Sequence, residues 1–315
     1  MQKYIFSILI AAFISIIQFA FSQNEYTPSV LYTIPWGNNP GELSSDFQTS
    51  ESLEVFEPGP FAVSENGDLV IFDHRINAEE PYYSEFMLKK FDSNGYLLAF
   101  RSIQDNGISL DRPWRIAILN SGEVAASSSS VPQTITLLDS NLNVLHEITF
   151  PYSDSEPYCL FEFTPTNNNS FWLAFAVHIR VNDNDYQQYY KTEIFLDGSY
   201  STPEITWDDI TNTVIPAHYI SPTGEPFLCD ADMYGYVYTF TDKYEGWRLT
   251  KSKLNEQGTE YEIVYTNDVL PVTGWESFVE LVDAGPKHFV TWCGDFYTIH
   301  AADEGVVLTK YTYQP

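Results

Sequence analysis

The sequence predicts an all-β protein, a β-propeller whose four-stranded antiparallel blades stand around a central axis. Short apolar runs bounded by Gly, Asn and Asp recur along the chain, turn signals of two kinds alternate, and helix signals are nearly absent. A four-stranded sheet with two apolar faces must bury both, and a ring places each sheet between two neighbours while leaving only short edges. We expect six blades, with five as the alternative.

Residues 1–22 have the features of a secretory signal peptide. A single lysine is followed by the apolar run Tyr4–Ile17, and Ala20–Ser22 places small residues at the spacing that signal peptidase recognises. We expect cleavage before Gln23, which makes the mature protein secreted or periplasmic, without membrane insertion. The alternative is an uncleaved anchor, because the segment is just long enough to span a bilayer.

The chain is strongly acidic, with 15 basic and 43 acidic residues and a formal net charge of −28. Nucleic acids and anionic membrane surfaces would repel such a chain, so we exclude them as partners. The charge favours solubility and is typical of an extracellular or periplasmic protein. The aromatic content of 16% suits strands whose faces pack against other sheets.

The three cysteines are too few and too scattered for a disulfide framework, and no spacing of cysteine and histidine suggests zinc. Cys229 and Cys293 lie on apolar runs, so we expect them to be buried free thiols. A bridge between them is the alternative, and it requires Cα atoms within about 7 Å.

The stretch Phe61–Arg101 is the clearest repeat unit. Tight hairpin turns need positive φ, which Asn and Gly adopt readily, and this predicts turns at Glu65–Gly67 and Asp92–Gly95. The strands of this unit are expected at Phe61–Val63, Leu69–Phe72, Phe86–Phe91 and Tyr96–Phe100.

Weaker copies of this unit follow, with expected blade boundaries at 61–108, 112–154, 156–210, 214–268 and 274–315. The first turn of each copy is expected to end at Gly67, Gly122, Asn169, Gly224 and Gly285. The second turn is expected to end at Gly95, Leu142, Gly198, Gly258 and Gly305. The strands before the later first turns are expected at Trp114–Leu119, Leu160–Phe163, His218–Ile220 and Phe278–Val282.

The segment 23–60 precedes these copies and contains two apolar runs, Val30–Ile34 and Leu53–Phe56, around a loop rich in Gly, Pro and Ser. It either forms a sixth, imperfect blade or lends a strand to the last blade and so closes the ring. We prefer the sixth blade by a small margin.

Four segments, Tyr32–Glu42, Pro60–Leu69, Asp73–Ile76 and Phe91–Leu98, together resemble the NHL-type repeat, in which a strand and a Gly turn lead to an Asp-x-His-Arg-Ile-like signature and a final Phe-Asp-x-x-Gly. The resemblance covers one unit well, with an insertion at Asn77–Glu85, and the later units lack His-Arg-Ile. It implies a six-bladed propeller and brings no active site with it.

Aromatic and basic residues near predicted strand ends are candidates for a binding face. Trp114, Trp247 and Trp275 lie where a ring of blades delivers side chains to its mouth, and His74 and Arg75 end a strand of the first unit. Such residues hold sugars or peptides in many binding sites. The alternative is packing between blades for the tryptophans and pairing with nearby acids for Arg75.

The segment around Asp183 and Asp185 is the candidate metal site. An Asp-x-Asp loop offers oxygen ligands to Ca²⁺, but the Gly and the terminal Glu of a full calcium loop are missing. We expect a solvated hairpin loop, and Ca²⁺ is the one cofactor that we keep as an alternative.

No catalytic arrangement of residues is recognisable. The sequence therefore favours a secreted, non-enzymatic binding or scaffold protein that engages an extracellular protein or glycan through one face of the ring. The alternative is a propeller enzyme, lactonase-like or glycoside-cleaving, that uses carboxylates at the channel with or without a divalent metal.

Overall fold

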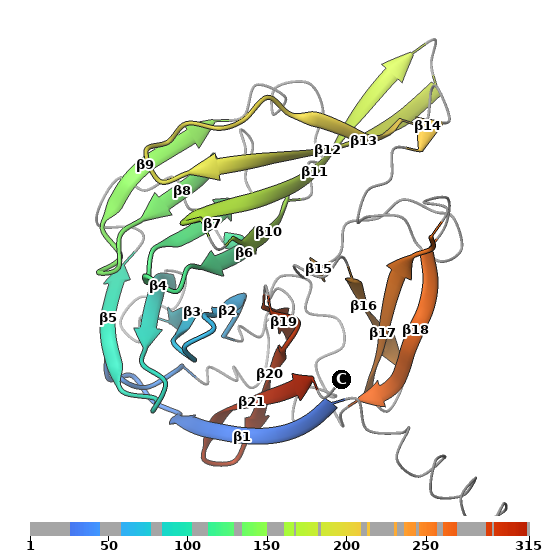
Figure 1. Cartoon of the computed structure of the whole chain (residues 1–315). Coiled ribbons are helices and arrows are strands. Elements are labelled where there is room, and N and C mark those ends of the chain that lie inside the picture. The colour runs from blue at the N-terminus through green and yellow to red at the C-terminus, as the bar shows by residue number, and fades with distance from the viewer. Residues whose placement is uncertain are drawn as a thin grey trace, which may run out of the picture.

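The computed structural model describes residues 26–44, 58–76, 84–102, 113–128, 134–149, 161–166, 168–181, 184–208, 213–214, 230–231, 236–243, 246–256, 261–269, 288–291 and 293–313. Within these ranges every helix or strand is a β-strand, and the strands form five antiparallel sheets. Figure 1 shows the sheets arranged around a common centre. The predicted all-β class is confirmed. In the described ranges no helix is long and apolar enough to cross a membrane.

Each sheet is a blade whose first strand lies nearest the centre of the ring. From the centre outward, the first blade contains β2 (Phe61–Val63), β3 (Leu69–Ile76), β4 (Ser84–Phe91) and β5 (Leu97–Ser102). The second contains β6 (Pro113–Ile118), β7 (Val124–Ser128), β8 (Thr134–Leu138) and β9 (Val144–Thr149). The third contains β10 (Phe161–Pro165), β11 (Ser170–Val181), β12 (Asn184–Phe195), β13 (Glu204–Asp208) and β14 (Thr213–Val214). The fourth contains β15 (Asp230–Ala231), β16 (Tyr236–Lys243), β17 (Gly246–Leu254) and β18 (Tyr261–Val269). The fifth contains β19 (His288–Val290), β20 (Phe296–Ala302), β21 (Gly305–Tyr313) and β1 (Tyr26–Pro35).

The innermost strands contact one another in a cycle, β2 to β6, β10, β15, β19 and back to β2. The first described strand, β1, lies beside the last, β21, and the two pair antiparallel from Tyr26 opposite Tyr313 to Pro35 opposite Gly305 (Figure 1). The part of the chain that the structure describes contains no sixth sheet. The preferred count of six blades stays a prediction, and Leu53–Phe56 lies outside the described residues.

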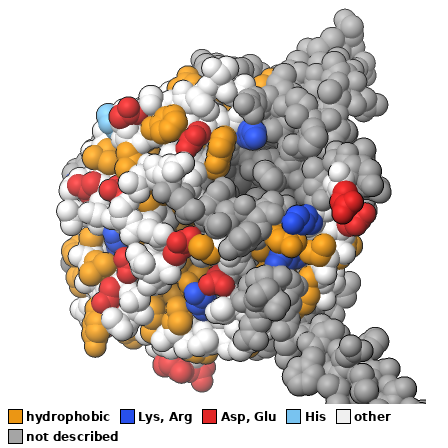
Figure 2. Space-filling view, in the orientation of Figure 1, with side chains coloured by type: hydrophobic (Ala, Val, Ile, Leu, Met, Phe, Trp, Pro, Cys, Tyr) orange, Lys and Arg blue, Asp and Glu red, His pale blue; other side chains and the backbone are white. Residues whose placement is uncertain are grey.

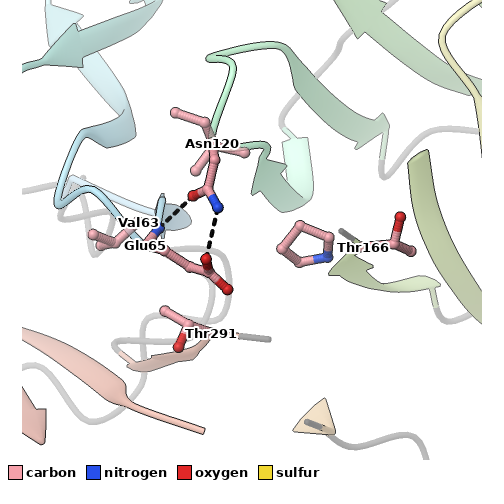
Figure 3. A pocket seen from close by; sticks show the side chains of 7 residues that line it. Val63, Glu65, Asn120, Thr166 and Thr291 are labelled. Atoms are coloured by element: carbon pink, nitrogen blue, oxygen red, sulfur yellow. Dashed lines mark hydrogen bonds between the residues drawn. The ribbon is translucent and has the colours of Figure 1, made fainter. Parts of the chain in front are cut away.

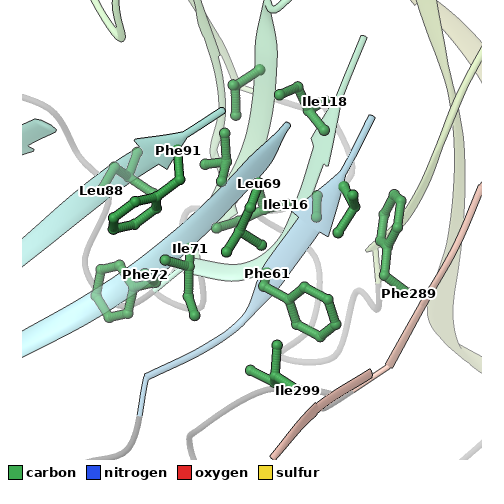
Figure 4. Packing of buried hydrophobic residues seen from close by; sticks show 14 of the residues in the cluster. Phe61, Leu69, Ile71, Phe72, Leu88, Phe91, Ile116, Ile118, Phe289 and Ile299 are labelled. Atoms are coloured by element: carbon green, nitrogen blue, oxygen red, sulfur yellow. The ribbon is translucent and has the colours of Figure 1, made fainter. Parts of the chain in front are cut away.

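Alternation along the strands sends successive side chains to opposite neighbouring blades. In the second blade, Ile116 and Ile118 pack toward the first blade, in the cluster that contains Phe61 (Figure 4). Ala117, between them, packs toward the third blade, in the cluster that contains Phe163. Each described sheet face of this blade is therefore buried against a different partner.

The turns that join the first and second strands, which we call the inner turns, share one geometry. Gly67, Gly122 and Gly294 have φ of 90°, 98° and 85°. Each donates its N–H to the carbonyl three residues earlier at 2.9–3.0 Å. The predicted turns at Gly67 and Gly122 are confirmed, as is the third at Asn169, where φ is 55°.

The inner turn of the fifth blade differs from the prediction. In the fifth blade the innermost strand is β19 and the turn contains Gly294, so the assignment of these roles to Phe278–Val282 and Gly285 was wrong. Gly285 is followed by Pro286, which cannot donate to a strand ladder. The corresponding fourth-blade signals, His218–Ile220 and Gly224, lie outside the described residues, and β15 is the innermost strand there.

The outer turns, between the third and fourth strands, follow the prediction in three blades. Gly95, Leu142 and Gly198 have φ of 83°, 64° and 82°. The third-blade turn is followed by an isolated bridge between Ile194 and Tyr200. In the fifth blade Gly305 begins β21, which is the third strand, so its turn joins the second and third strands and the prediction of an outer turn there was wrong. Gly258 lies outside the described residues.

A fully buried ion pair attaches the segment after β1 to the first blade. Lys89 Nζ lies 2.6 Å from Asp73 Oδ2, and neither side chain is exposed. The other carboxylate oxygen of Asp73 accepts the N–H of Ser44 at 2.9 Å, and Lys89 also donates to the carbonyl of Glu42. An unpaired charge is costly to bury. Removing one partner of this pair would therefore leave the other as an uncompensated buried charge and strongly destabilise the folded protein.

We therefore expect Lys89→Met to lower the free energy of unfolding by about 3–5 kcal/mol. Lys310→Met is the matched control, because Lys310 Nζ is also 2.6 Å from a carboxylate, that of Asp295, but the two side chains are 25% and 20% exposed. Its loss should be about 1 kcal/mol or less. Urea unfolding measures both, and equal losses in the two variants would contradict the buried role of Lys89.

Candidate functional site

A pocket opens where inner turns of four blades meet at the centre of the ring (Figure 3). Its lining combines apolar side chains at strand ends with polar side chains of the turns. The lining residues are Val63, Glu65, Ile118, Asn120, Pro165, Thr166 and Thr291. The empty volume is about 230 Å³, much of it open to solvent, and the inner part has room for about one water molecule.

Glu65 is the acidic group of this pocket and is held from two sides. Its N–H donates to Asn120 Oδ1 at 2.8 Å, and Asn120 Nδ2 donates to Glu65 Oε2 at 2.7 Å (Figure 3). Asn66 Nδ2 donates to the Asn120 carbonyl at 3.2 Å. On the other side, Cys293 Sγ donates to Glu65 Oε1 at 2.7 Å. The carboxylate therefore links the fifth, first and second blades.

Cys293 is an exposed free thiol, so the expectation that it is buried was wrong. It occupies an inner turn between β19 and β20, not a strand. Partial burial of the thiol, together with the hydrogen bond and negative charge of Glu65, raises the pKa of Cys293 to about 12. Cys159 and Cys229 lie outside the described residues.

Two threonine hydroxyls complete the polar lining. Thr291 Oγ1 donates to the carbonyl of Asp295 at 3.1 Å. Thr166 Oγ1 accepts the N–H of Asn168 at 3.1 Å and shares a hydrogen bond with Ser170 Oγ at 2.6 Å. Both side chains are thus fixed within their own turns, with their oxygens beside the pocket.

Beside the pocket, Lys310 is paired with Asp295. Burial lowers the pKa of Lys310, but the hydrogen bond and charge of Asp295 outweigh it, and the net pKa is raised. Lys310 therefore stays protonated and neutralises Asp295. This leaves Glu65 as the acidic side chain of the lining itself.

The pocket lies on what we call the tight-turn face, the face of the ring that carries the inner and outer turns. In an antiparallel meander, the connection from second to third strand and the exit to the next blade lie at the opposite end, which we call the connection face. The sequence-predicted residues that begin or end strands at the connection face are His74 and Arg75 of β3, Trp114 of β6, Asp185 of β12 and Trp247 of β17.

The topology thus brings five separately predicted positions to one face. Trp275 and Asp183 lie outside the described residues, so the proposed calcium loop is represented by the backbone of Asp185 alone. Among the described residues, no group of three His, Cys, Asp or Glu side chains is placed to hold a metal ion.

Sequence reasoning missed the pocket. Glu65 was assigned to a turn, and Asn120 and Cys293 received no site role. The repeated turn geometry was the available signal, because Glu65 and Asn120 occupy the same position of successive inner turns. Aligning the turns would have placed both residues at the centre of the ring.

No protein-family model matches this chain, and neither does any curated protein. The resemblance to NHL-type repeats therefore stays a prediction. Among solved structures the chain is similar to a luciferin-regenerating enzyme, with 11% identity over 78% of this chain and 74% of that one, at a TM-score of 0.34.

It is also similar to an alpha-L-arabinofuranosidase from Podospora anserina, with 11% identity over 92% of this chain and 98% of that one, at a TM-score of 0.38. An endo-arabinase from Bacteroides thetaiotaomicron shows 13% identity over 78% and 90%, at a TM-score of 0.32. Likeness at this level carries no argument about activity.

The pKa of Cys293 predicts slow alkylation. At pH 8 we expect its reaction with iodoacetamide to be more than about tenfold slower than that of free cysteine, because the thiolate is the nucleophile. Glu65→Gln should accelerate the reaction by removing the carboxylate charge. Glu256→Gln, a change of the same charge in an exposed residue of the fourth blade, should not. Peptide-level mass spectrometry follows Cys293 alone, and equal rates in the two variants would refute the contact with Glu65.

Proposed function

We propose that this protein is a secreted β-propeller that binds a neutral glycan through the connection face and catalyses no reaction. The supporting observation is that five positions chosen from sequence, two of them tryptophans, fall at the same end of the blades. They come from four different blades. A shared face assembled from distant chain segments is the usual way in which a propeller builds a binding site.

The residue types at this face support a glycan as the ligand. Tryptophan offers a broad apolar surface with a polar N–H, and histidine, arginine and aspartate supply hydrogen bonds to hydroxyl groups. The net charge of −28 disfavours acidic polysaccharides, which the protein would repel. A neutral glycan satisfies both conditions, and a protein ligand is the alternative outcome of the test below.

We also propose that the ring has five blades and that β1 closes it. The cyclic contacts of β2, β6, β10, β15 and β19 and the long pairing of β1 with β21 support this count. We further propose export, with cleavage before Gln23, on the basis of the signal-peptide features of residues 1–22.

The enzyme alternative requires two carboxylates about 5–10 Å apart at the centre of the ring. In the described pocket Glu65 is the one acidic lining residue, and both of its oxygens already accept hydrogen bonds. This pocket therefore lacks the second carboxylate that a glycoside-cleaving site needs.

The test measures retention of the mature protein in gels that contain neutral or acidic polysaccharides, with reducing-end release assayed on the same panel. We expect retention by a neutral glycan and no release. Trp114→Ala and Trp247→Ala should each weaken binding about tenfold, because losing the stacking of a sugar on one aromatic ring costs about 1–2 kcal/mol.

Trp172→Ala is the matched control, because Trp172 lies next to the inner turn of the third blade, at the opposite end, where Lys191 Nζ is 5.3 Å from its ring. Thermal unfolding checks that each variant folds. Retention unchanged in both Trp114 and Trp247 variants would rule out the connection face as the binding surface, and glycan cleavage would establish the enzyme instead.

A further inference from the structure

We propose that the pocket on the tight-turn face binds a primary ammonium group, either the side chain of a lysine in a partner protein or a free alkylamine. This site is separate from the proposed glycan face and does not depend on it. Three features of the pocket support the proposal: its size, the acceptors that line it and the charges that surround it.

Size selects a small head group. The inner part of the pocket has room for about one water molecule. An ammonium group is of similar size and carries three N–H donors. A guanidinium or a trimethylammonium group is too broad for this space. Val63, Ile118 and Pro165 form the apolar part of the lining, where the methylene groups of an alkyl chain can pack.

The lining offers acceptors that are oriented before any ligand binds. Glu65 accepts one hydrogen bond at each oxygen, from Asn120 and from Cys293, and each oxygen keeps a second lone pair. The hydroxyl of Thr291 donates its hydrogen bond to the carbonyl of Asp295, so the hydroxyl oxygen can accept a hydrogen bond from a ligand. A carboxylate fixed by two donors loses little freedom when it receives a cation.

The surrounding charge favours a cation over an anion. Two lysines near the inner turns are already engaged, Lys310 with Asp295 and Lys90 with the carbonyls of Gly122 and Ser140 at 2.9 and 3.1 Å. On the described surface in view in Figure 2, acidic side chains are spread widely and basic ones are sparse. An incoming phosphate or carboxylate would be repelled by Glu65 and by the net charge.

The test is an NMR titration of the full mature protein with n-butylammonium up to about 50 mM, since a single small head group binds in the millimolar range. We expect shifts at the amides of the pocket turns. Butyltrimethylammonium has the same charge but no N–H donor and a broader head, so it should not produce them. Equal responses to the two cations would overturn the proposal, as would no response to either.

Variants provide an independent check. Glu65→Gln should weaken n-butylammonium binding about tenfold, because a hydrogen bond to a charged acceptor is lost. Thr291→Val, which keeps the charge, should weaken it a few-fold. Glu256→Gln is the control for the general field, because Glu256 lies exposed in the fourth blade. Binding lowered equally by Glu65→Gln and Glu256→Gln would show charge attraction without a site and overturn the proposal.

A peptide that contains lysine and has an acetylated N-terminus distinguishes the two sources of the ammonium group, a lysine of a partner protein and a free alkylamine. Tighter binding of the peptide than of n-butylammonium identifies a protein partner that inserts a lysine. Equal affinity identifies the ammonium group itself as the ligand, as expected for a free amine. A failure of glycan binding at the connection face leaves all of these outcomes unchanged, because the two faces are probed by different variants.

Discussion

The need to bury both faces of every sheet is the constraint on which the rest of this structure depends. The second blade sends alternate side chains into two different clusters, one shared with the first blade and one with the third. A sheet at the end of an open row would leave one such face in water, at a cost of roughly 25 cal/mol for each Å² of apolar surface. The pairing of β1 with β21 completes the fifth blade from the other end of the chain.

The sheet register also places three lysines at equivalent positions. Lys90, Lys251 and Lys310 occupy one position of the third strand in three blades, opposite Val70, Tyr238 and Tyr297. From this position Lys90 reaches the second blade, and Lys251 of the fourth blade lies 5.5 Å from the ring centre of Tyr26 in the fifth. Lys90 donates to turn carbonyls, Lys251 lies 4.3 Å from the ring centre of Tyr236, and Lys310 pairs with Asp295. Each ammonium group therefore has a different polar or aromatic partner, and the partner of Lys310 lies in its own blade.

Local chemistry explains which parts of the fold could be predicted. The turns at Gly67, Gly122 and Asn169 follow from residues that tolerate positive φ beside apolar runs, and these signals lie within a few residues of sequence. Gly294 carries the same signal, but the neighbouring Cys293 was assigned to a buried strand and the turn was placed at Gly285. Blade number could not be read from local signals, because β1 pairs with a strand at the other end of the chain.

The pocket was beyond prediction for a related reason. Glu65 is hydrogen-bonded to Asn120, 55 residues away in the sequence, and to Cys293, 228 residues away. Only the closure of the ring brings these turns together. The residues that were singled out instead fall on the opposite face. Two proposed functions therefore belong to two faces of one ring, and both depend on the way in which that ring closes.

Closure can be measured by a disulfide between the two strands that complete the ring. Thr27 of β1 and Thr312 of β21 are exposed and directly opposite each other. In the double variant Thr27→Cys, Thr312→Cys, we predict that mild oxidation links the two introduced thiols, seen by mass spectrometry as one cross-linked peptide pair. The control, Thr27→Cys with Thr149→Cys of β9, should give no such link. Absence of the link in the first variant, or equal linkage in both, would contradict a ring closed by β1 on β21.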